Sequence, residues 1–334
     1  MSYPRIVDAI FNSPWAIHRP FFGTMFPLMQ SRIFSDSAQL ESFTANGAGP
    51  MFRAEQSAAS GKGKGGNFSA SRITKRTDGR LIDQSARIHS EALQRCGGDA
   101  GTYHTIVREE EAALPPGQIL HVFGSGVLGK HLSSMDEMCA GGLSVDRIQS
   151  AITAAEEDDK VSGVMLHLDT PGGICYGMPE TFAMVKKLRE TKTVAAFCDS
   201  LTASAGQWCI AASDVVYVTP SADLGSIGVY SAFTDYTEWC KKNGITVEVI
   251  ADGVHKGAGY PGTALTEEQR TKIKADVLEC SRQFKDDIRS AREGITDETM
   301  QGQCFTGKSA VEAKLADAVV INLNEALADL AKAI

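Results

Sequence analysis

Short apolar runs and stretches of helical spacing alternate along the chain from Gln118 onward. The runs are rich in Val, Ile and Leu, as is typical of buried strands, and they cover 119–124, 161–169, 193–198, 214–219 and 245–250. Amphipathic spacing predicts helices between and after them, near 144–157, 178–190, 204–212, 232–242 and 266–292. This alternation predicts an α/β fold with largely parallel pairing of the strands.

The part of the chain before this pattern has a different composition. Residues 45–80 are rich in Gly, Ser, Lys and Arg and hold few large apolar side chains, so they cannot bury enough surface to offset the entropy of ordering. Weak helical spacing over 81–112 ends at a Leu-Pro-Pro-Gly stretch. We therefore predict three parts: a docking segment over 1–44, a flexible, partly helical linker over 45–116, and one catalytic-size domain over 117–334.

Composition excludes several classes of protein. The net charge of -8 argues against a dedicated nucleic-acid binder, so we expect at most weak contacts between the basic linker and a polyanion. The eight cysteines are scattered without a Cys-x-x-Cys pair, which favours reduced thiols, no metal site and no cofactor. Neither a continuous apolar span nor a signal peptide is found, so we expect a cytoplasmic chain that is neither secreted nor anchored in a membrane.

Three small-residue loops follow the predicted strands and could carry chemistry. The loop 168–173, Leu-Asp-Thr-Pro-Gly-Gly, can turn tightly and aim backbone N–H groups outward, as an oxyanion site requires. The stretch 202–206 presents Ser204 between alanines, and 221–229 presents Ser226 between glycines. Taken singly, each loop also fits an ordinary turn or a helix-capping serine.

A serine nucleophile needs a base, and the sequence offers two kinds. Seven histidines are present, but none carries a local signature, and His121 and His167 fall inside predicted strands where packing is the simpler role. Lys256 follows the last predicted strand between glycines, and it can act as a base if burial lowers its pKa from about 10.4 toward 7–8. An isolated lysine, however, is normally a solvated side chain.

Taken together, the four elements resemble the signal peptide peptidase A family of serine peptidases, peptidase family S49, over about 118–323. The family's elements occur here in the same order, as Leu-Asp-Thr-Pro-Gly-Gly, Ala-Ser-Ala-Gly-Gln-Trp, Leu-Gly-Ser-Ile-Gly-Val and Gly-Val-His-Lys-Gly. Ser226 follows Ser204 by 22 residues and Lys256 follows it by 52, as in single-domain members. Ala205 replaces the family's usual glycine, and Gln207 with Trp208 matches its pattern only loosely.

The resemblance implies a ClpP/crotonase-like fold with an N-terminal extension and a Ser-Lys dyad. By this resemblance Ser204 is the nucleophile, Lys256 the general base and Ser226 the hydroxyl that orients the lysine amine. The oxyanion would be held by backbone N–H groups of Gly172 or Gly173 and of Ala205. Because that last donor is a main-chain group, an alanine can supply it if its backbone conformation fits.

The opening stretch, from Ser2 to Ile17, resembles the N-terminus of phage and prophage members of this family. The resemblance implies a prohead protease that cuts capsid or scaffold proteins and assembles into a ring-like homo-oligomer, in the host cytoplasm or inside the prohead. Three alternatives stay open at this point: a cytosolic bacterial peptidase, a crotonase-type acyl-CoA enzyme, and a non-catalytic scaffold protein.

Overall fold

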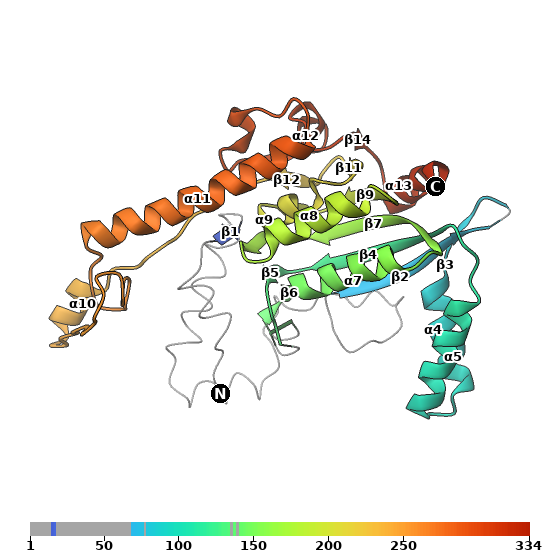
Figure 1. The fold of residues 1–334 in the computed structure, drawn as a ribbon, viewed down its shortest axis with the longest axis horizontal. Coiled ribbons are helices and arrows are strands. Elements are labelled where there is room, and N and C mark those ends of the chain that lie inside the picture. The colour runs from blue at the N-terminus through green and yellow to red at the C-terminus, as the bar shows by residue number, and fades with distance from the viewer. Residues whose placement is uncertain (1–14, 18–67, 77, 134–135, 138–139) are drawn as a thin grey trace.

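A computed structural model describes residues 15–17, 68–76, 78–133, 136–137 and 140–334, with only the backbone over 15–17. Most of the docking segment predicted over 1–44, and the first part of the linker predicted to begin at 45, lie outside these residues. The described chain combines one large sheet, two small sheets and the helices that cover them (Figure 1).

The large sheet has seven strands in the order β14-β11-β9-β7-β4-β2-β3. The five strands from β4 to β14 pair in parallel, whereas β2 pairs antiparallel with both β4 and β3. The predicted α/β fold class with largely parallel pairing is therefore confirmed. The strands are β2 (Phe68–Lys75), β3 (Leu81–Asp83), β4 (Gln118–Ser125), β7 (Val161–Asp169), β9 (Thr193–Cys198), β11 (Val215–Val218) and β14 (Ala318–Val319).

Two layers of helices bury the two faces of this sheet. Along β7, Val164 and Leu166 point into a core shared with α7 (Val145–Glu157), α8 (Met178–Leu188) and α9 (Ala205–Ile210). The alternate residue, Met165, points to the other face, where α13 (Leu323–Ala333) packs. Because both faces are covered, these strands read as continuous apolar runs, which is why the sequence pattern found them.

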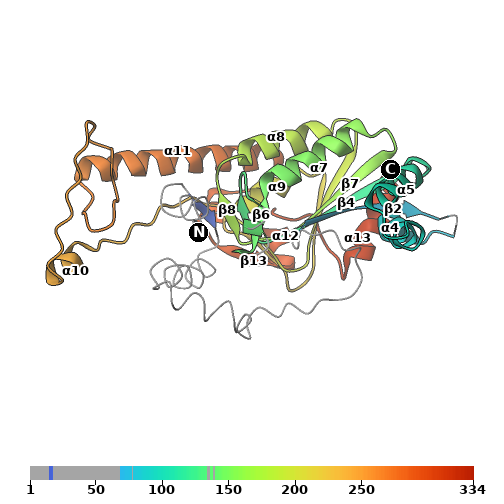
Figure 2. The same ribbon diagram turned by 90° about the horizontal axis from the view of Figure 1, so that it is seen from below.

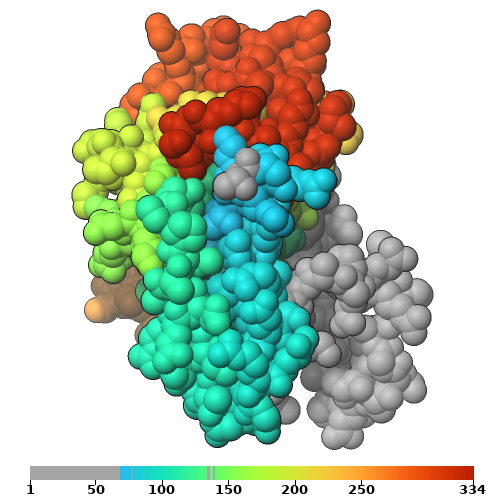
Figure 3. Space-filling view, turned by 90° about the vertical axis from the view of Figure 1, so that its right-hand side faces the viewer, coloured from blue at the N-terminus to red at the C-terminus, as the bar shows by residue number. Residues whose placement is uncertain are grey.

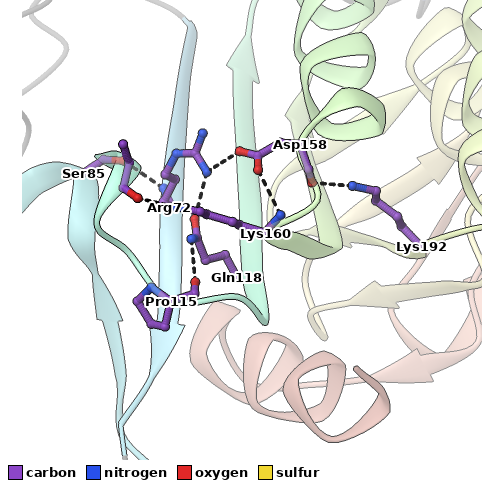
Figure 4. Close-up of polar contacts among 8 residues, drawn as sticks. Arg72, Ser85, Pro115, Gln118, Asp158, Lys160 and Lys192 are labelled. Atoms are coloured by element: carbon purple, nitrogen blue, oxygen red, sulfur yellow. Dashed lines mark hydrogen bonds and ion pairs between the residues drawn. The ribbon is translucent and has the colours of Figure 1, made fainter. Parts of the chain in front are cut away.

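Residues 68–75, which the sequence predicts as linker, instead form β2 and pair with β4 from Phe68–Gly124 to Ile73–Ile119. Figure 4 shows what fixes this strand: the Arg72 guanidinium donates to Gln118 Oε1 over 2.8 Å and lies 2.7 Å from an Asp158 carboxylate oxygen. The linker prediction is wrong here because few large apolar side chains mark the strand, and its partners lie far along the chain.

The helical spacing over 81–112 corresponds to a hairpin of two helices, α4 (Gln84–Arg95) and α5 (Ala100–Ala112). The side chains of Asp83 and Asp99 cap their first turns by accepting from backbone N–H groups. Figure 3 shows this hairpin, in cyan, projecting away from α13. The predicted partly helical character of this stretch is confirmed.

Two small sheets lie where β7 and β9 end, and they carry the loops that the sequence analysis singled out. One has the order β10-β12-β13, with β10 (Leu201–Ala203), β12 (Asp223–Gly225) and β13 (Cys304–Thr306). The other has the order β1-β8-β5-β6, with β1 (Trp15–Ile17), β8 (Gly172–Ile174), β5 (Val127–Gly129) and β6 (Gly142–Ser144). The chain thus passes from the large sheet into a small one directly at each candidate loop.

A long extension leaves the body between β12 and the end of the chain. It consists of residues 231–278, called the arm here, and includes α10 (Thr237–Lys242) and the first half of α11 (Glu267–Ala291) (Figures 1 and 2). The strand predicted over 245–250 is wrong, because this segment pairs with no strand of the described chain. The second half of α11 is anchored on the body, where Phe284 stacks on Trp208 at 4.4 Å between ring centroids.

Three short elements complete the C-terminal region: η1 (Asp297–Met300), α12 (Lys308–Glu312) and the α13 helix already described. Arg292, only 7% exposed, joins this region to the end of α11 by donating to both carboxylate oxygens of Asp317, over 2.9 and 2.8 Å. The Asp317 carboxylate also accepts from the backbone N–H of Val216 in β11. This network holds the C-terminal elements against the edge of the large sheet.

Candidate active site

Ser204 lies at a sharp turn between β10 and α9. Its backbone has φ 55° and ψ -116°, a conformation that costs a non-glycine residue about 1–3 kcal/mol. Its side chain is fully buried, and its Oγ has no hydrogen-bond partner among the residues that the structure describes. The simple reading as a capping serine fails, because the side chain makes no cap hydrogen bond to α9. A strained strand-to-helix turn of this kind is typical of serine nucleophiles.

The strained turn is held by backbone hydrogen bonds on both sides. The N–H of Ser204 donates to the carbonyl of Gly225 over 2.7 Å, and the N–H of Trp208 donates to the carbonyl of Ser204 over 3.0 Å. The first bond ties the turn to the neighbouring small strand β12. The second starts the α9 helix. The serine therefore keeps its conformation through main-chain contacts and leaves its hydroxyl unused.

Ser226 lies beside Ser204. The strands β10 and β12 are parallel neighbours with Ala203 opposite Gly225, so the residues that follow them are brought side by side, about 5 Å apart between the strands. Ser226 is 6% exposed, has φ 53°, and donates its N–H to the carbonyl of Gln303 over 2.7 Å. The structure therefore brings two of the predicted site residues together.

The glycine loop after β7 packs against the same turn through Thr170. The N–H of Thr170 donates to the carbonyl of Leu201 over 2.6 Å, and its carbonyl accepts from the N–H of Ala203 over 2.9 Å. A Cβ on Gly206 would lie 2.3 Å from Thr170 Cγ2. The small residues around Ser204 therefore provide room for this loop of the chain itself.

The two glycines of the loop, Gly172 and Gly173, are both required by the geometry. Gly172 has φ 99°, which favours glycine, and a Cβ on Gly173 would lie 1.9 Å from the carbonyl oxygen of Leu128. The N–H of Gly172 donates to the Thr170 hydroxyl over 3.1 Å. Gly172 therefore already has an acceptor within the chain.

Lys256 is not brought to Ser204 within the chain. It is exposed on the arm, in a turned segment where the neighbouring Val254 carbonyl accepts from the Gln269 side chain over 2.8 Å. Gln269 lies in the first turn of α11, and α11 is in contact with the core of the body by Cys280, about 16 Å further along the helix axis. The predicted base therefore lies on a different part of the molecule from the predicted nucleophile.

Gln207 is a polar residue of this site whose burial the sequence did not reveal. It is fully buried in the first turn of α9, three residues after Ser204 and so on the same side of the helix. Neither its Oε1 nor its Nε2 has a hydrogen-bond partner among the described residues. A glutamine inside an otherwise apolar helix was the available signal, since a buried amide without partners is costly.

A partly buried histidine network connects β4, β7 and the end of β9. His167 Nε2 lies 2.9 Å from Asp199 Oδ1, and His167 Nδ1 lies 3.2 Å from His121 Nε2. Burial and the neighbouring His167 lower the pKa of His121 to about 4, and the hydrogen bond from His167 lowers the pKa of Asp199. The expected packing role of these histidines is thus extended by polar contacts that the sequence did not predict.

No group of three or more His, Cys, Asp or Glu side chains among the described residues could hold a metal ion. No described helix is both long enough and apolar enough to cross a membrane.

Comparisons with known proteins add to this geometry. The model of peptidase family S49 matches residues 186–334. Capsid assembly protease C of Escherichia phage lambda is 29% identical over 184 residues, which cover 54% of this chain and 42% of that protein. The head-tail preconnector protein GP5 of Enterobacteria phage P21 is 30% identical over 213 residues, 63% of this chain and 42% of that protein. The chain thus spans less than half the length of either relative.

Among solved structures, a mutant of the 1510-N membrane-bound stomatin-specific protease matches with 15% identity and a TM-score of 0.32, over 61% of this chain and 81% of that one. The family match includes Ser204, Ser226 and Lys256, and it begins within α8. Residues 186–334 of this chain therefore match the model of peptidase family S49, and they are called the S49 region here.

Proposed function

We propose that the chain is a serine endopeptidase that hydrolyses peptide bonds through Ser204. The observation that carries the proposal is the buried, unpartnered Oγ of Ser204 on a strained turn within the S49 region. Strain at a single residue persists only where the surrounding structure enforces it, and it is concentrated at functional sites. The two backbone hydrogen bonds of this turn supply that enforcement.

In the proposed reaction, neutral Lys256 takes the Ser204 proton as Oγ attacks the substrate carbonyl, and Ser226 orients the lysine amine. The backbone N–H groups of Ala205 and of Gly172 or Gly173 stabilise the oxyanion. The carbonyl–nitrogen bond then breaks as Lys256 returns the proton to the leaving amine, and water hydrolyses the acyl-enzyme. In the single chain Gly172 donates to Thr170 and Gly173 lies between β5 and β1, so either donor must exchange its present surroundings for the substrate oxygen.

We further propose that Lys256 reaches Ser204 of a neighbouring copy. The arm that carries it leaves the body, and its large apolar side chains are exposed: Phe233, Trp239, Ile245, Val249, Ile250, Val254, Tyr260 and Leu278. An apolar surface of this kind marks a protein–protein interface. Contacts in which each arm engages the next subunit are head-to-tail, and such contacts form a ring where the rotation between subunits closes. A ring-like homo-oligomer would therefore account both for the exposed apolar side chains of the arm and for a dyad formed by two copies.

The two phage relatives support a setting in head assembly. Their names describe a capsid assembly protease and a head-tail preconnector protein. We propose that this chain is a prohead protease whose substrates are capsid or scaffold proteins, acting in the host cytoplasm or inside the prohead. Co-expression with candidate capsid proteins, followed by mass spectrometry of the new termini, tests this assignment. Capsid proteins of unchanged mass in the presence of an active enzyme would contradict it.

Mixing two inactive variants tests the dyad and its origin in two copies together. Ser204→Ala and Lys256→Ala are each expected to be inactive, and a mixture assembled from both should regain activity. In a head-to-tail ring, about a quarter of the sites would join an intact Ser204 to an intact Lys256. The double variant mixed with Ser204→Ala is the control and should stay inactive. A mixture that assembles into common oligomers without any activity would exclude a site shared between copies.

A further inference from the structure

β8 has a strand on each of its two sides, and one of these strands, β1, belongs to the N-terminal part of the chain. β5 pairs with β8 in parallel, through Leu128 and Gly173. On the opposite side β1 pairs antiparallel, with Trp15 opposite Ile174, Ala16 opposite Gly173 and Ile17 opposite Gly172. Figures 1 and 2 both show β1, in blue, close to this part of the fold. Without β1, the outer side of β8 would be an open sheet edge.

This edge adjoins the candidate nucleophile. Gly172, the first residue of β8, follows Thr170, whose backbone exchanges hydrogen bonds with Leu201 and Ala203 directly before Ser204. Helix α9, which Ser204 begins, also packs against β8. Because the pairing is antiparallel, the segment 15–17 runs toward Ser204, and Ile17 is its nearest paired residue. An extended peptide on this edge would reach the nucleophile in the same direction.

An open strand edge binds extended peptides through main-chain hydrogen bonds, which do not depend on the peptide's side chains. A segment of the same chain that occupies such an edge excludes any other peptide from it. The full burial of Ser204 agrees with a molecule whose site is closed. The backbone pairing and this burial are separate observations that lead to the same interpretation.

We infer that the outer edge of β8 is the peptide-binding edge of this site and that the chain's own residues 15–17 occupy it in competition with substrate. The inference rests on the proposed peptidase function, because it takes the competing peptide to be a substrate. The occupancy itself is a matter of backbone pairing and can be measured without turnover. The segment must leave β8 before a substrate can pair with it.

Hydrogen exchange tests the pairing in the full-length chain, with Ser204→Ala as the background to exclude turnover. Ala16→Pro removes a backbone N–H and disfavours β pairing, so those amides of Gly173 and Ile174 that face β1 should exchange about tenfold faster, whereas the amide of Gly172, which donates to Thr170, should change little. Ala58→Pro, a proline placed elsewhere in the N-terminal region, is the matched control and should leave them unchanged. Equal exchange at 173–174 in the Ala16→Pro and control chains would overturn the inference.

Kinetics with Ser204 intact tests the competition. If residues 15–17 occupy the edge nine-tenths of the time, releasing them lowers the apparent KM about tenfold and leaves kcat unchanged. A synthetic peptide of residues 12–20 should inhibit Ala16→Pro competitively, and a scrambled peptide should not. Faster exchange with an unchanged KM would overturn the competition. Absence of peptidase activity from every variant would refute the proposed function, while the exchange result would still decide whether β1 occupies β8.

Discussion

Ser204 donates its backbone N–H to the carbonyl of Gly225 over 2.7 Å, and this single bond places the next residue, Ser226, beside it. Both serines follow paired strands, both have positive φ, and both are buried. Residues 22 positions apart in the sequence thus become neighbours through the register of two three-residue strands. The fold can use one of them as nucleophile and the other to orient a base.

Substitutions at the proposed site should affect activity in a fixed order. Ser204→Ala is expected to lower kcat about 10³-fold or more because it removes the nucleophile. Lys256→Ala should lower kcat at least about a hundredfold because it removes the base. Ser226→Ala should have a smaller effect because its hydroxyl orients the lysine and does not react. Peptide hydrolysis and fluorophosphonate labelling measure these effects.

Ser213 provides the matched control for these variants. It is 1% exposed, and its Oγ has no hydrogen-bond partner among the described residues, as for Ser204. Ser213→Ala should keep both hydrolysis and labelling, because Ser213 lies at the far end of α9. If labelling persisted in Ser204→Ala and disappeared in Ser213→Ala, the nucleophile would be Ser213 and the proposed assignment to Ser204 would be wrong.

The strained turn predicts an unusual effect on stability. At φ 55° and ψ -116°, a glycine is relaxed and an alanine is not, so Ser204→Gly should be more stable than Ser204→Ala. The relief of about 1–3 kcal/mol exceeds the entropic cost of glycine, which leaves a net gain of about 1 kcal/mol in the free energy of unfolding. Urea unfolding of the two variants measures it. Ala203→Gly, in the strand just before the turn, should be destabilising instead.

Stability should fall as the pH is lowered, because of His121. Its pKa is about 4 in the folded chain and 6.5 without burial, so the unfolded chain binds more protons between these values. The stabilising contribution is complete above about pH 6.5 and is lost progressively toward pH 4, by on the order of 3 kcal/mol. Denaturant unfolding at several pH values measures this slope.

His121→Gln should flatten that dependence, because glutamine takes up no proton in this range. His104→Gln is the control, since His104 is exposed on α5 and should leave the slope as it is in the parent. A slope that survives unchanged in His121→Gln would assign the titration to another group.

The arm predicts a link between assembly and activity. Ile250 is 91% exposed in the single chain, and Ile250→Asp places a charge on the proposed contact surface. The variant should lose oligomer mass in light scattering and lose activity with it, while the unfolding of the body stays unchanged. Asn243→Asp, which adds the same single negative charge at the end of α10, tests whether charge alone is responsible. An active monomer of Ile250→Asp would refute a site shared between copies.

Much of the fold could be predicted because both faces of the large sheet are buried. Strands such as β7 then become apolar runs that stand out in the sequence. The loops at Ser204 and Gly172 were also found, because tight turns after strands require small residues. Their assembly into one site depends on the pairing of β10 with β12 and on the contacts of Thr170, which no local pattern encodes.

The errors have identifiable physical causes. β2 has only two buried residues, Ile73 and Thr74, and its place in the sheet depends on Arg72 reaching Gln118, 46 residues later in the chain. Over 245–250 the apolar pattern is real, but the residues that carry it are exposed, as at Ile250. A local apolar pattern shows which side chains are expected to be buried. It does not show whether the surface that buries them belongs to the same chain or to another copy.

The position of β2 also changes where the folded unit begins. A truncated chain starting at residue 117 would lack β2 and leave the N–H and C=O groups along one side of β4 without partners. Such a bare strand recruits other chains, so that fragment should precipitate, whereas one starting shortly before Phe68 keeps the sheet edge covered. Residues 68–75, which the sequence predicts as linker, therefore cover the edge of β4 and protect the large sheet from pairing with other chains.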